Sequence, residues 1–312
     1  MGSHMKPAVL IALILALAAV GIALKIGYDF LRRYTRVPPV PSGTIVHRNL
    51  PYVTGGHARQ KLDLYLPKGA ENPPLMILVH GGSFTEGDKR DEDVAEWLTQ
   101  GYAVASLNYR LVQDAIFPAQ IEDMKAAARW LRASASRYGY DPDRFGARGS
   151  SAGGYLVTML GATGATTKFD IGENLGVSSR VQAVADRYAP IDFLQMDAHQ
   201  IPGGVLVNTP DSPIAKLIDG IPVDNRDKAE SANPINYITK DCPPFIIIHG
   251  DSDPLVPHHQ SEILAAALER AGVPVTLYTV RGGGHGGFDD PGAAAAVRDF
   301  FARYLKPGQS ER

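Results

Sequence analysis

The sequence has a single cysteine, Cys242, among its 312 residues. One cysteine excludes an intramolecular disulfide and a cysteine-rich metal cluster, so packing must hold the fold together. An excess of charge of one sign is also missing, because 31 Lys and Arg face 33 Asp and Glu. No basic block interleaved with aromatic residues occurs, and nucleic acid is therefore not expected as a partner. With 45% hydrophobic residues, the chain can bury a full core, and we expect one main domain.

The one long hydrophobic run lies near the N-terminus. Residues 1–5 read Met-Gly-Ser-His-Met, which is typical of an expression-tag remnant, and they carry no weight here. Residues 8–24 contain no charged residue and are at the short end of what spans a bilayer. We predict a membrane anchor or a signal segment over residues 6–36, with Ala16–Ala18 as an alternative cleavage site. The protein is accordingly expected to be membrane-anchored or exported, and the side of the membrane stays open.

The rest of the chain has the pattern of an α/β protein. A Pro-rich linker, 37–43, precedes a folded domain expected at 44–306. Short apolar runs alternate there with segments of helical period, which predicts a mostly parallel central sheet flanked by helices, after an antiparallel lead-in at 45–66. Residues 192–237 mix Pro, Gly, Asn and Asp between two strands, and we expect them to form a small cap or lid. The expected strands are 75–79, 102–107, 144–148, 181–185, 245–248 and 275–280, and the expected helices are 91–100, 120–138, 153–160, 259–271 and 292–304.

A candidate nucleophile lies between a short strand and a helix. Gly149–Gly153 matches the pattern Gly-x-Ser-x-Gly, and only Ser151 satisfies its spacing. The small flanking residues permit a sharp turn that lifts the serine hydroxyl above the sheet. With 32 glycines in the chain the pattern alone is weak, and the strand before it and the helix after it strengthen the prediction.

A serine nucleophile needs a histidine base and an acid that orients it. Asp251 and Asp253 follow the strand 245–248, and His285 follows the strand 275–280 in a Gly-rich loop. Catalytic groups of open α/β sheets gather at these carboxyl ends. We predict Asp253 as the acid, because the acid after such a strand usually lies a few residues beyond its end.

Two further groups of residues complete the predicted site. His80–Phe84 follows the strand 75–79, where Gly81 and Gly82 are expected to offer backbone N–H groups to a substrate oxyanion together with that of Ala152. Candidate substrate-binding residues are Phe84, Tyr155 and Phe193. No cofactor is expected. A metal site formed by His249, His258, His259 and Asp251 is the alternative, but no His or Cys spacing supports it.

Several motifs together resemble those of the α/β-hydrolase superfamily. They are the serine turn, His80–Phe84, Asn108–Leu111, Phe117–Asp123, Tyr138–Arg144 and Asp253–Pro257. More narrowly, the chain is similar to carboxylesterases related to hormone-sensitive lipase and to bacterial feruloyl and acetylxylan esterases, the BD-FAE-like branch. Ser83 in place of a third glycine and Ser150 in place of the usual Asp favour the latter branch.

This resemblance implies ester hydrolysis through an acyl-enzyme, with Ser151, Asp253 and His285 as the triad. A small-molecule ester, with short-chain acyl groups such as the acetyl or feruloyl esters of carbohydrates, is the expected substrate. An amide hydrolase of arylformamidase type or an acyltransferase on the same triad stays open. A non-catalytic binding protein is disfavoured because all three triad residues are present. Oligomeric state is not encoded in any pattern that we find.

Overall fold

The computed structural model describes residues 39–288 and 290–306. The described residues belong to one compact unit, which contains the predicted catalytic domain. The hydrophobic run at 8–24 and the predicted anchor or signal segment lie outside the described residues. Within the described part, no helix combines the length and apolar character needed to cross a bilayer.

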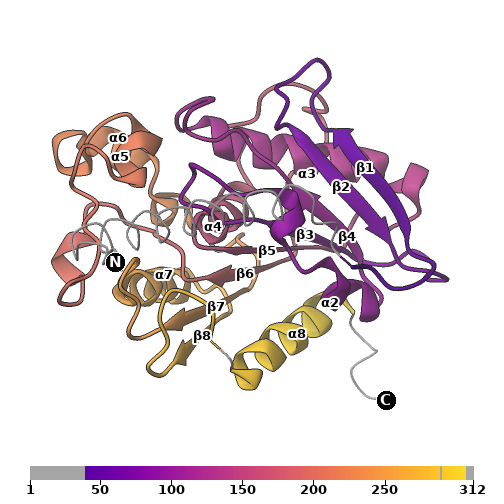
Figure 1. Cartoon of the computed structure of the whole chain (residues 1–312). Coiled ribbons are helices and arrows are strands. Elements are labelled where there is room, and N and C mark those ends of the chain that lie inside the picture. Colours follow the sequence, from indigo (N-terminus) through magenta and orange to yellow (C-terminus); the bar gives the residue numbers. More distant parts are fainter. Residues whose placement is uncertain (1–38, 289, 307–312) are drawn as a thin grey trace, which may run out of the picture. The chain divides into compact units, whose positions relative to one another are not determined.

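Eight strands form one sheet across the described part of the chain, in the order β1-β2-β4-β3-β5-β6-β7-β8 (Figure 1). β1 and β2 pair antiparallel, as does β2 with β4, and all later pairs are parallel. The predicted α/β fold with its antiparallel lead-in is therefore confirmed. The strands are β1 Ile45–Pro51, β2 Lys61–Leu66, β3 Leu75–Val79, β4 Ala103–Leu107, β5 Phe145–Ser150, β6 Ala183–Arg187, β7 Phe245–Gly250 and β8 Val275–Val280.

Helices cover both faces of this sheet (Figure 1). The strand β3 shows how the core is divided, because its side chains alternate between faces. Leu75, Ile77 and Val79 belong to the cluster under α3, α4 and α7, while Met76 and Leu78 join the cluster under α2 and α8. A strand buried on both faces is continuously apolar, which explains why the sequence predicted it well. The helices are α2 Val94–Thr99, α3 Ala119–Tyr138, α4 Ala152–Thr163, α7 His259–Arg270 and α8 Pro291–Leu305.

The insertion between β6 and β7 contains two short helices, α5 Pro213–Ile218 and α6 Arg226–Ser231, which Figure 1 shows close together. Brief 3-10 turns complete it at Asp197–His199, Pro222–Asp224 and Pro234–Tyr237, and another, Lys89–Asp91, precedes α2. The end of β7 differs from its prediction. The strand continues past Ile248 through His249 to Gly250 because Gly250 still pairs with Val280 on β8, and this brings a buried histidine into the sheet.

Candidate active site

Ser151 lies in the turn between β5 and α4, with φ 55° and ψ −122°. Few non-glycine residues adopt such a backbone conformation, and it is maintained only where the surroundings enforce it. Gly149 and Gly153 make the turn possible. A Cβ on Gly149 would overlap the carbonyl oxygen of Gly153, and one on Gly153 would overlap that of Val79. The turn therefore requires glycine at both flanks and presents the Ser151 side chain at the carboxyl ends of the strands.

The structure brings Ser151, His285 and Asp253 into one hydrogen-bonded row. His285 Nε2 is 2.9 Å from Ser151 Oγ, and His285 Nδ1 is 2.7 Å from Asp253 Oδ2. These distances suit direct proton transfer between the hydroxyl and the imidazole. Asp251, the other carboxylate considered from the sequence, is exposed and accepts a hydrogen bond from the Gly282 N–H. Asp253 is therefore the carboxylate that contacts the imidazole.

Asp253 is fully buried and its carboxylate accepts four hydrogen bonds. Oδ1 accepts from the backbone N–H groups of Leu255 at 2.8 Å and Val256 at 3.0 Å. Oδ2 faces His285 and also His249 Nε2, at 3.1 Å. Burial raises the pKa of Asp253, but the hydrogen bonds from the two histidines outweigh it and hold this pKa well below its ordinary value. The carboxylate is charged throughout the neutral range.

His249 is the functional neighbour that sequence reasoning missed. It lies on β7 with its ring fully buried, and its Nδ1 is 2.6 Å from Ser261 Oγ on α7. In the sequence it entered only as a candidate metal ligand. A histidine four residues before the acid, at the end of a buried apolar strand, was the signal that could have found it.

The loop after β3 carries the predicted oxyanion donors. His80 is buried, its ring stacks on Tyr109 at 4.5 Å, and the Tyr109 hydroxyl donates to the His80 carbonyl. His80 Nε2 is 3.2 Å from an Arg59 nitrogen, which can only donate, so Nε2 accepts and Nδ1 carries the proton. Nδ1–H then donates to the Gly81 carbonyl at 2.7 Å. Because C=O and N–H point in opposite directions across a trans peptide, this bond fixes where the Gly82 N–H points.

The N–H of Ala152 is the third predicted donor. Ala152 is the first residue of α4, so its N–H has no carbonyl partner one turn earlier in the helix. The positive end of the helix dipole also lies here. Gly81 closely approaches the same turn, since a Cβ on it would lie 2.8 Å from the Ser150 carbonyl oxygen. The predicted donors thus come from two elements held in contact.

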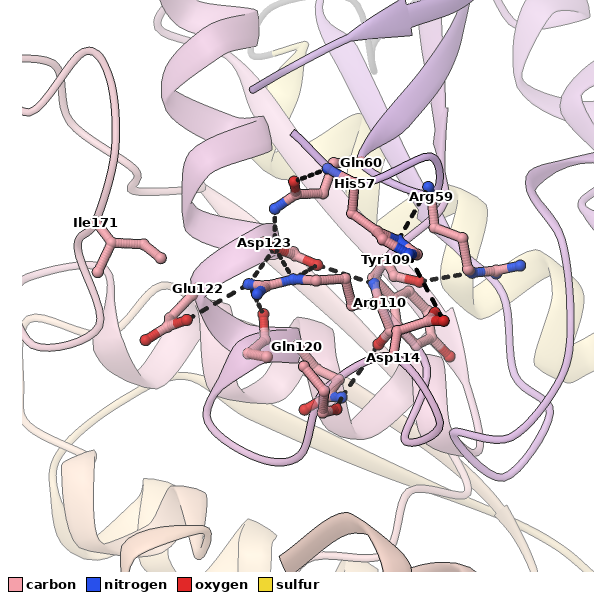
Figure 2. Close-up of polar contacts among 12 residues, drawn as sticks. His57, Arg59, Gln60, Tyr109, Arg110, Asp114, Gln120, Glu122, Asp123 and Ile171 are labelled. Atoms are coloured by element: carbon pink, nitrogen blue, oxygen red, sulfur yellow. Dashed lines mark hydrogen bonds and ion pairs between the residues drawn. The ribbon is translucent and has the colours of Figure 1, made fainter. Parts of the chain in front are cut away.

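A polar cluster supports this loop from the neighbouring elements (Figure 2). The Arg110 guanidinium binds the buried Asp123 carboxylate on α3 through Nε at 3.0 Å and a terminal nitrogen at 2.7 Å. Gln60 donates to the same carboxylate at 2.7 Å. Arg59 donates to the Tyr109 carbonyl at 2.8 Å and also contacts His80. It therefore joins this cluster to the loop His80–Phe84. The motifs Asn108–Leu111 and Phe117–Asp123, which are separate in the sequence, meet here.

A cavity of about 100 Å³ opens beside the serine. Its lining includes Ser151 and His285 together with residues of the insertion, among them Val207 and Ile214. Phe84 lines the cavity, as predicted. The complete lining is Ser83, Phe84, Ser151, Ala152, Pro190, Met196, Val205, Val207, Pro213, Ile214, Leu255, Val256 and His285.

Tyr155 and Phe193 do not reach this cavity, which corrects their predicted substrate contact. Both are buried, and the Tyr155 ring lies 5.5 Å from the rings of Phe84 and Phe193. The Tyr155 hydroxyl donates to the Ala232 carbonyl at 2.6 Å. Apolar aromatic side chains were read as a substrate surface, but here they join α4 to the insertion.

The alternative metal site is not assembled. Within the described ranges, no group of three or more His, Cys, Asp and Glu side chains is placed to hold a metal ion. His249 uses both ring nitrogens in contacts with Ser261 and Asp253, and His259 stacks on His199 with ring centroids 3.4 Å apart.

The sheet order, the strained serine turn and the location of the site at the carboxyl ends of the strands define an α/β hydrolase. The BD-FAE family model matches residues 62–268. The chain therefore belongs to the BD-FAE family, within the carboxylesterase branch of these hydrolases.

Relatives of known structure and sequence agree with this assignment. A truncated carbohydrate esterase from gut microbiota is 33% identical with a TM-score of 0.77, over 84% of this chain and 96% of that one. Esterase LipQ of Mycobacterium tuberculosis is 30% identical over 80% of this chain and 62% of its own length, and an arylesterase of Saccharolobus solfataricus is 27% identical over 78% of each. The chain spans 52–63% of the length of three mycobacterial relatives.

Proposed function

We propose that this protein is a serine carboxylesterase that hydrolyses short-chain esters through an acyl-enzyme. The observation that carries the proposal is the row of hydrogen bonds from Ser151 Oγ through His285 to the buried Asp253. The named esterases among its relatives support ester hydrolysis as the reaction.

His285 acts as the general base in this mechanism. Its Nε2 takes the Ser151 proton as the oxygen attacks the ester carbonyl, and it then returns that proton to the departing alcohol. Asp253 holds the proton-bearing Nδ1 toward itself and stabilises the imidazolium that forms. Water repeats the same two steps on the acyl-enzyme and releases the acid.

Backbone N–H groups of Gly81, Gly82 and Ala152 bind the oxyanion of each tetrahedral intermediate. They are fixed before the reaction begins, so they stabilise the developing charge without reorganisation, at about 3 to 4 kcal/mol per donor. The neutral, hydrogen-bonded His80 keeps the loop that carries two of them in place.

The cavity favours a small, uncharged acyl group. Its volume of about 100 Å³ is far below the roughly 300–1,000 Å³ of pockets that bury drug-sized ligands. Apart from Ser83, Ser151 and His285, its lining is apolar. An acetyl group is therefore preferred over the bulkier feruloyl group. Carbohydrate esterases among the structural relatives support a sugar ester as the natural substrate.

Hydrolysis of p-nitrophenyl esters from acetyl to dodecanoyl tests the proposal. Turnover is expected to be fastest with acetyl or butyryl, and Ser151→Ala should lower kcat by at least about 10³-fold because the nucleophile is lost. Ser150→Ala is the matched control, since it changes the adjacent serine of the same turn.

Equal activity of Ser151→Ala and the unsubstituted protein would contradict the proposed mechanism. If esters of every length resist a folded protein, N-formyl amides and alternative acyl acceptors become the substrates to test. Turnover of those compounds alone would replace the esterase by an amide hydrolase or an acyltransferase.

A further inference from the structure

The carboxylate of Asp253 is contacted by a second histidine, which the catalytic row does not require. His249 Nε2 lies 3.1 Å from Asp253 Oδ2 and 3.0 Å from the Val256 carbonyl oxygen. The His249 ring and the Asp253 side chain are both fully buried. Bulk solvent therefore does not reach this contact, and buried polar groups of this kind need hydrogen-bond partners.

The partners of His249 determine which nitrogen carries its proton. Nε2 faces two oxygens, a carboxylate and a carbonyl, neither of which can donate. Nε2 must therefore be protonated. Nδ1 then accepts from the Ser261 hydroxyl at 2.6 Å, and the ring is neutral. Burial lowers the pKa of His249 against the opposing effect of Asp253, which agrees with a neutral ring.

We propose that His249 is a positioning residue for the triad, donating from Nε2 to Asp253 Oδ2 and so sharing that oxygen with His285. The two oxygens at Nε2 determine the tautomer, and the Ser261 hydroxyl, on α7, contacts Nδ1 on the other side of the same ring. The proposal rests on the proposed esterase function, and it extends the row to Ser261–His249–Asp253–His285–Ser151.

Two effects on catalysis follow from this arrangement. The fourth hydrogen bond prevents the carboxylate from rotating away from His285. It also withdraws charge from Oδ2, so that without it the more negative oxygen stabilises the His285 imidazolium more strongly. Loss of the His249 donor should therefore lower kcat and move the acid limb of the kcat/KM profile to higher pH.

Other titratable groups lie near the two rings. Tyr188 lies edge-on to both imidazoles, and His258 lies 5.4 Å from the His249 ring. Asp186, on β6 next to the serine turn, has its pKa raised to about 7 by burial. The comparison must therefore be made between variants that retain all three groups.

The variants His249→Asn and His249→Gln form a matched pair. The shorter amide nitrogen of Asn takes the place of Nδ1 and faces Ser261, whereas that of Gln takes the place of Nε2 and still donates to Asp253. With p-nitrophenyl acetate, His249→Asn should lose about tenfold in kcat at a KM within twofold. Its acid limb should rise by about half a pH unit. His249→Gln should recover most of kcat and the original acid limb.

Ser261→Ala separates this role from a structural one. It removes a buried hydrogen bond of His249 but leaves the Nε2 contact with Asp253, so Tm should fall while the acid limb stays in place. A folded His249→Asn with the original kcat and acid limb would overturn the proposal. So would an equal shift of the acid limb in Ser261→Ala.

The tautomer of His249 can be measured without any turnover. In the ¹⁵N-histidine spectrum of the unsubstituted protein at neutral pH, the His249 signal, assigned by its absence in His249→Gln, should be that of an Nε2–H ring. An Nδ1–H ring would overturn the proposal, and this measurement decides the matter if His249→Asn does not fold. Activity that does not depend on Ser151 would instead refute the esterase function, and the tautomer would still test the contact itself.

Discussion

Three histidines at the carboxyl ends of the strands differ only in their surroundings. His285 is partly accessible between Ser151 and Asp253. His249 is buried between a carboxylate and a serine hydroxyl, and His80 is buried against the guanidinium of Arg59. Desolvation disfavours the charged imidazole in the two buried cases. In the proposed mechanism His285 exchanges the proton, whereas burial favours the neutral ring in the other two.

His80 makes the stability of the protein depend on pH. Burial lowers the pKa of His80 from 6.5 to about 4. As the pH falls from 6.5 to about 4, the unfolded chain binds a proton at this residue and the folded protein does not. The free energy of unfolding should therefore fall by about 3 kcal/mol through that window. Urea unfolding of the unsubstituted protein and of His80→Asn between pH 7 and pH 4 measures how much His80 contributes to this change in the free energy of unfolding.

His80→Asn retains an N–H for the Gly81 carbonyl but does not titrate, so its stability should change less over this pH range. His47→Asn, on β1, is the control and should keep the full pH dependence. An identical loss of stability in His80→Asn and the unsubstituted protein would show that His80 is not the source.

Two glycines in and after β5 allow a close approach between elements. Gly146 lets α8 approach the sheet, and Gly153 lets α4 approach β3. At Gly146, a Cβ would lie 2.8 Å from side-chain atoms of Met76, Phe301 and Leu305, so the glycine makes room for α8 on the sheet. Arg148, on the same strand, pairs with Glu92 at 3.1 Å. The weakly apolar sequence of β5 is therefore explained by packing and by an ion pair.

Gly→Ala substitutions should affect the two positions differently, because the added methyl group meets backbone atoms at Gly153 and side-chain atoms at Gly146. At Gly153 the added methyl group meets the backbone of β3, which cannot move aside, and Gly153→Ala should unfold the serine turn and abolish activity. Gly146→Ala meets side chains that can adjust, and should cost about 1–3 kcal/mol. Denaturant unfolding together with esterase activity measures both effects.

Gly176→Ala is the control, because no atom lies within 4 Å of its added Cβ and its φ is not positive. It should change the free energy of unfolding by less than about 0.5 kcal/mol. Gly153→Ala with normal activity and stability would refute the close approach of α4 to β3.

At the scale of the whole molecule, the folded domain and the N-terminal segment differ in how their apolar residues are distributed along the chain. The domain buries apolar side chains on both faces of a sheet. Residues 8–24 are apolar on every side of a helical projection, a pattern suited to lipid or to a translocation channel. We propose from the sequence that this segment anchors or exports the enzyme.

Membrane anchoring can be tested with the full chain and phosphatidylcholine vesicles. If residues 8–24 insert, the protein should sediment with the vesicles and Leu15→Arg should return much of it to the supernatant, because an Arg at the centre of a span costs about 3 kcal/mol. Leu15→Ile is the matched control and should sediment like the unsubstituted protein. Recovery of the unsubstituted chain in the supernatant would argue against an anchor.

Residue order alone was sufficient for the features that depend on local chemistry. Continuous apolar runs such as 75–79 identify strands buried on both faces, and the glycines around Ser151 identify the strained turn. The resemblance of several sequence motifs to the α/β-hydrolase superfamily, and to its BD-FAE-like branch, is confirmed by the sheet and by the family match. The boundaries of α3 and α7 moved by only one residue, since the periodicity of their buried faces extends almost to their ends.

Only the tertiary structure decided which side chains meet across the sheet. It placed His249 against the carboxylate of Asp253 and packed Tyr155 and Phe193 against each other outside the lining of the cavity. These contacts join residues from different strands and helices, and their geometry depends on strand register, side-chain direction and burial together. Hydrophobic pattern reports that a residue is buried, but it does not report which neighbour it faces.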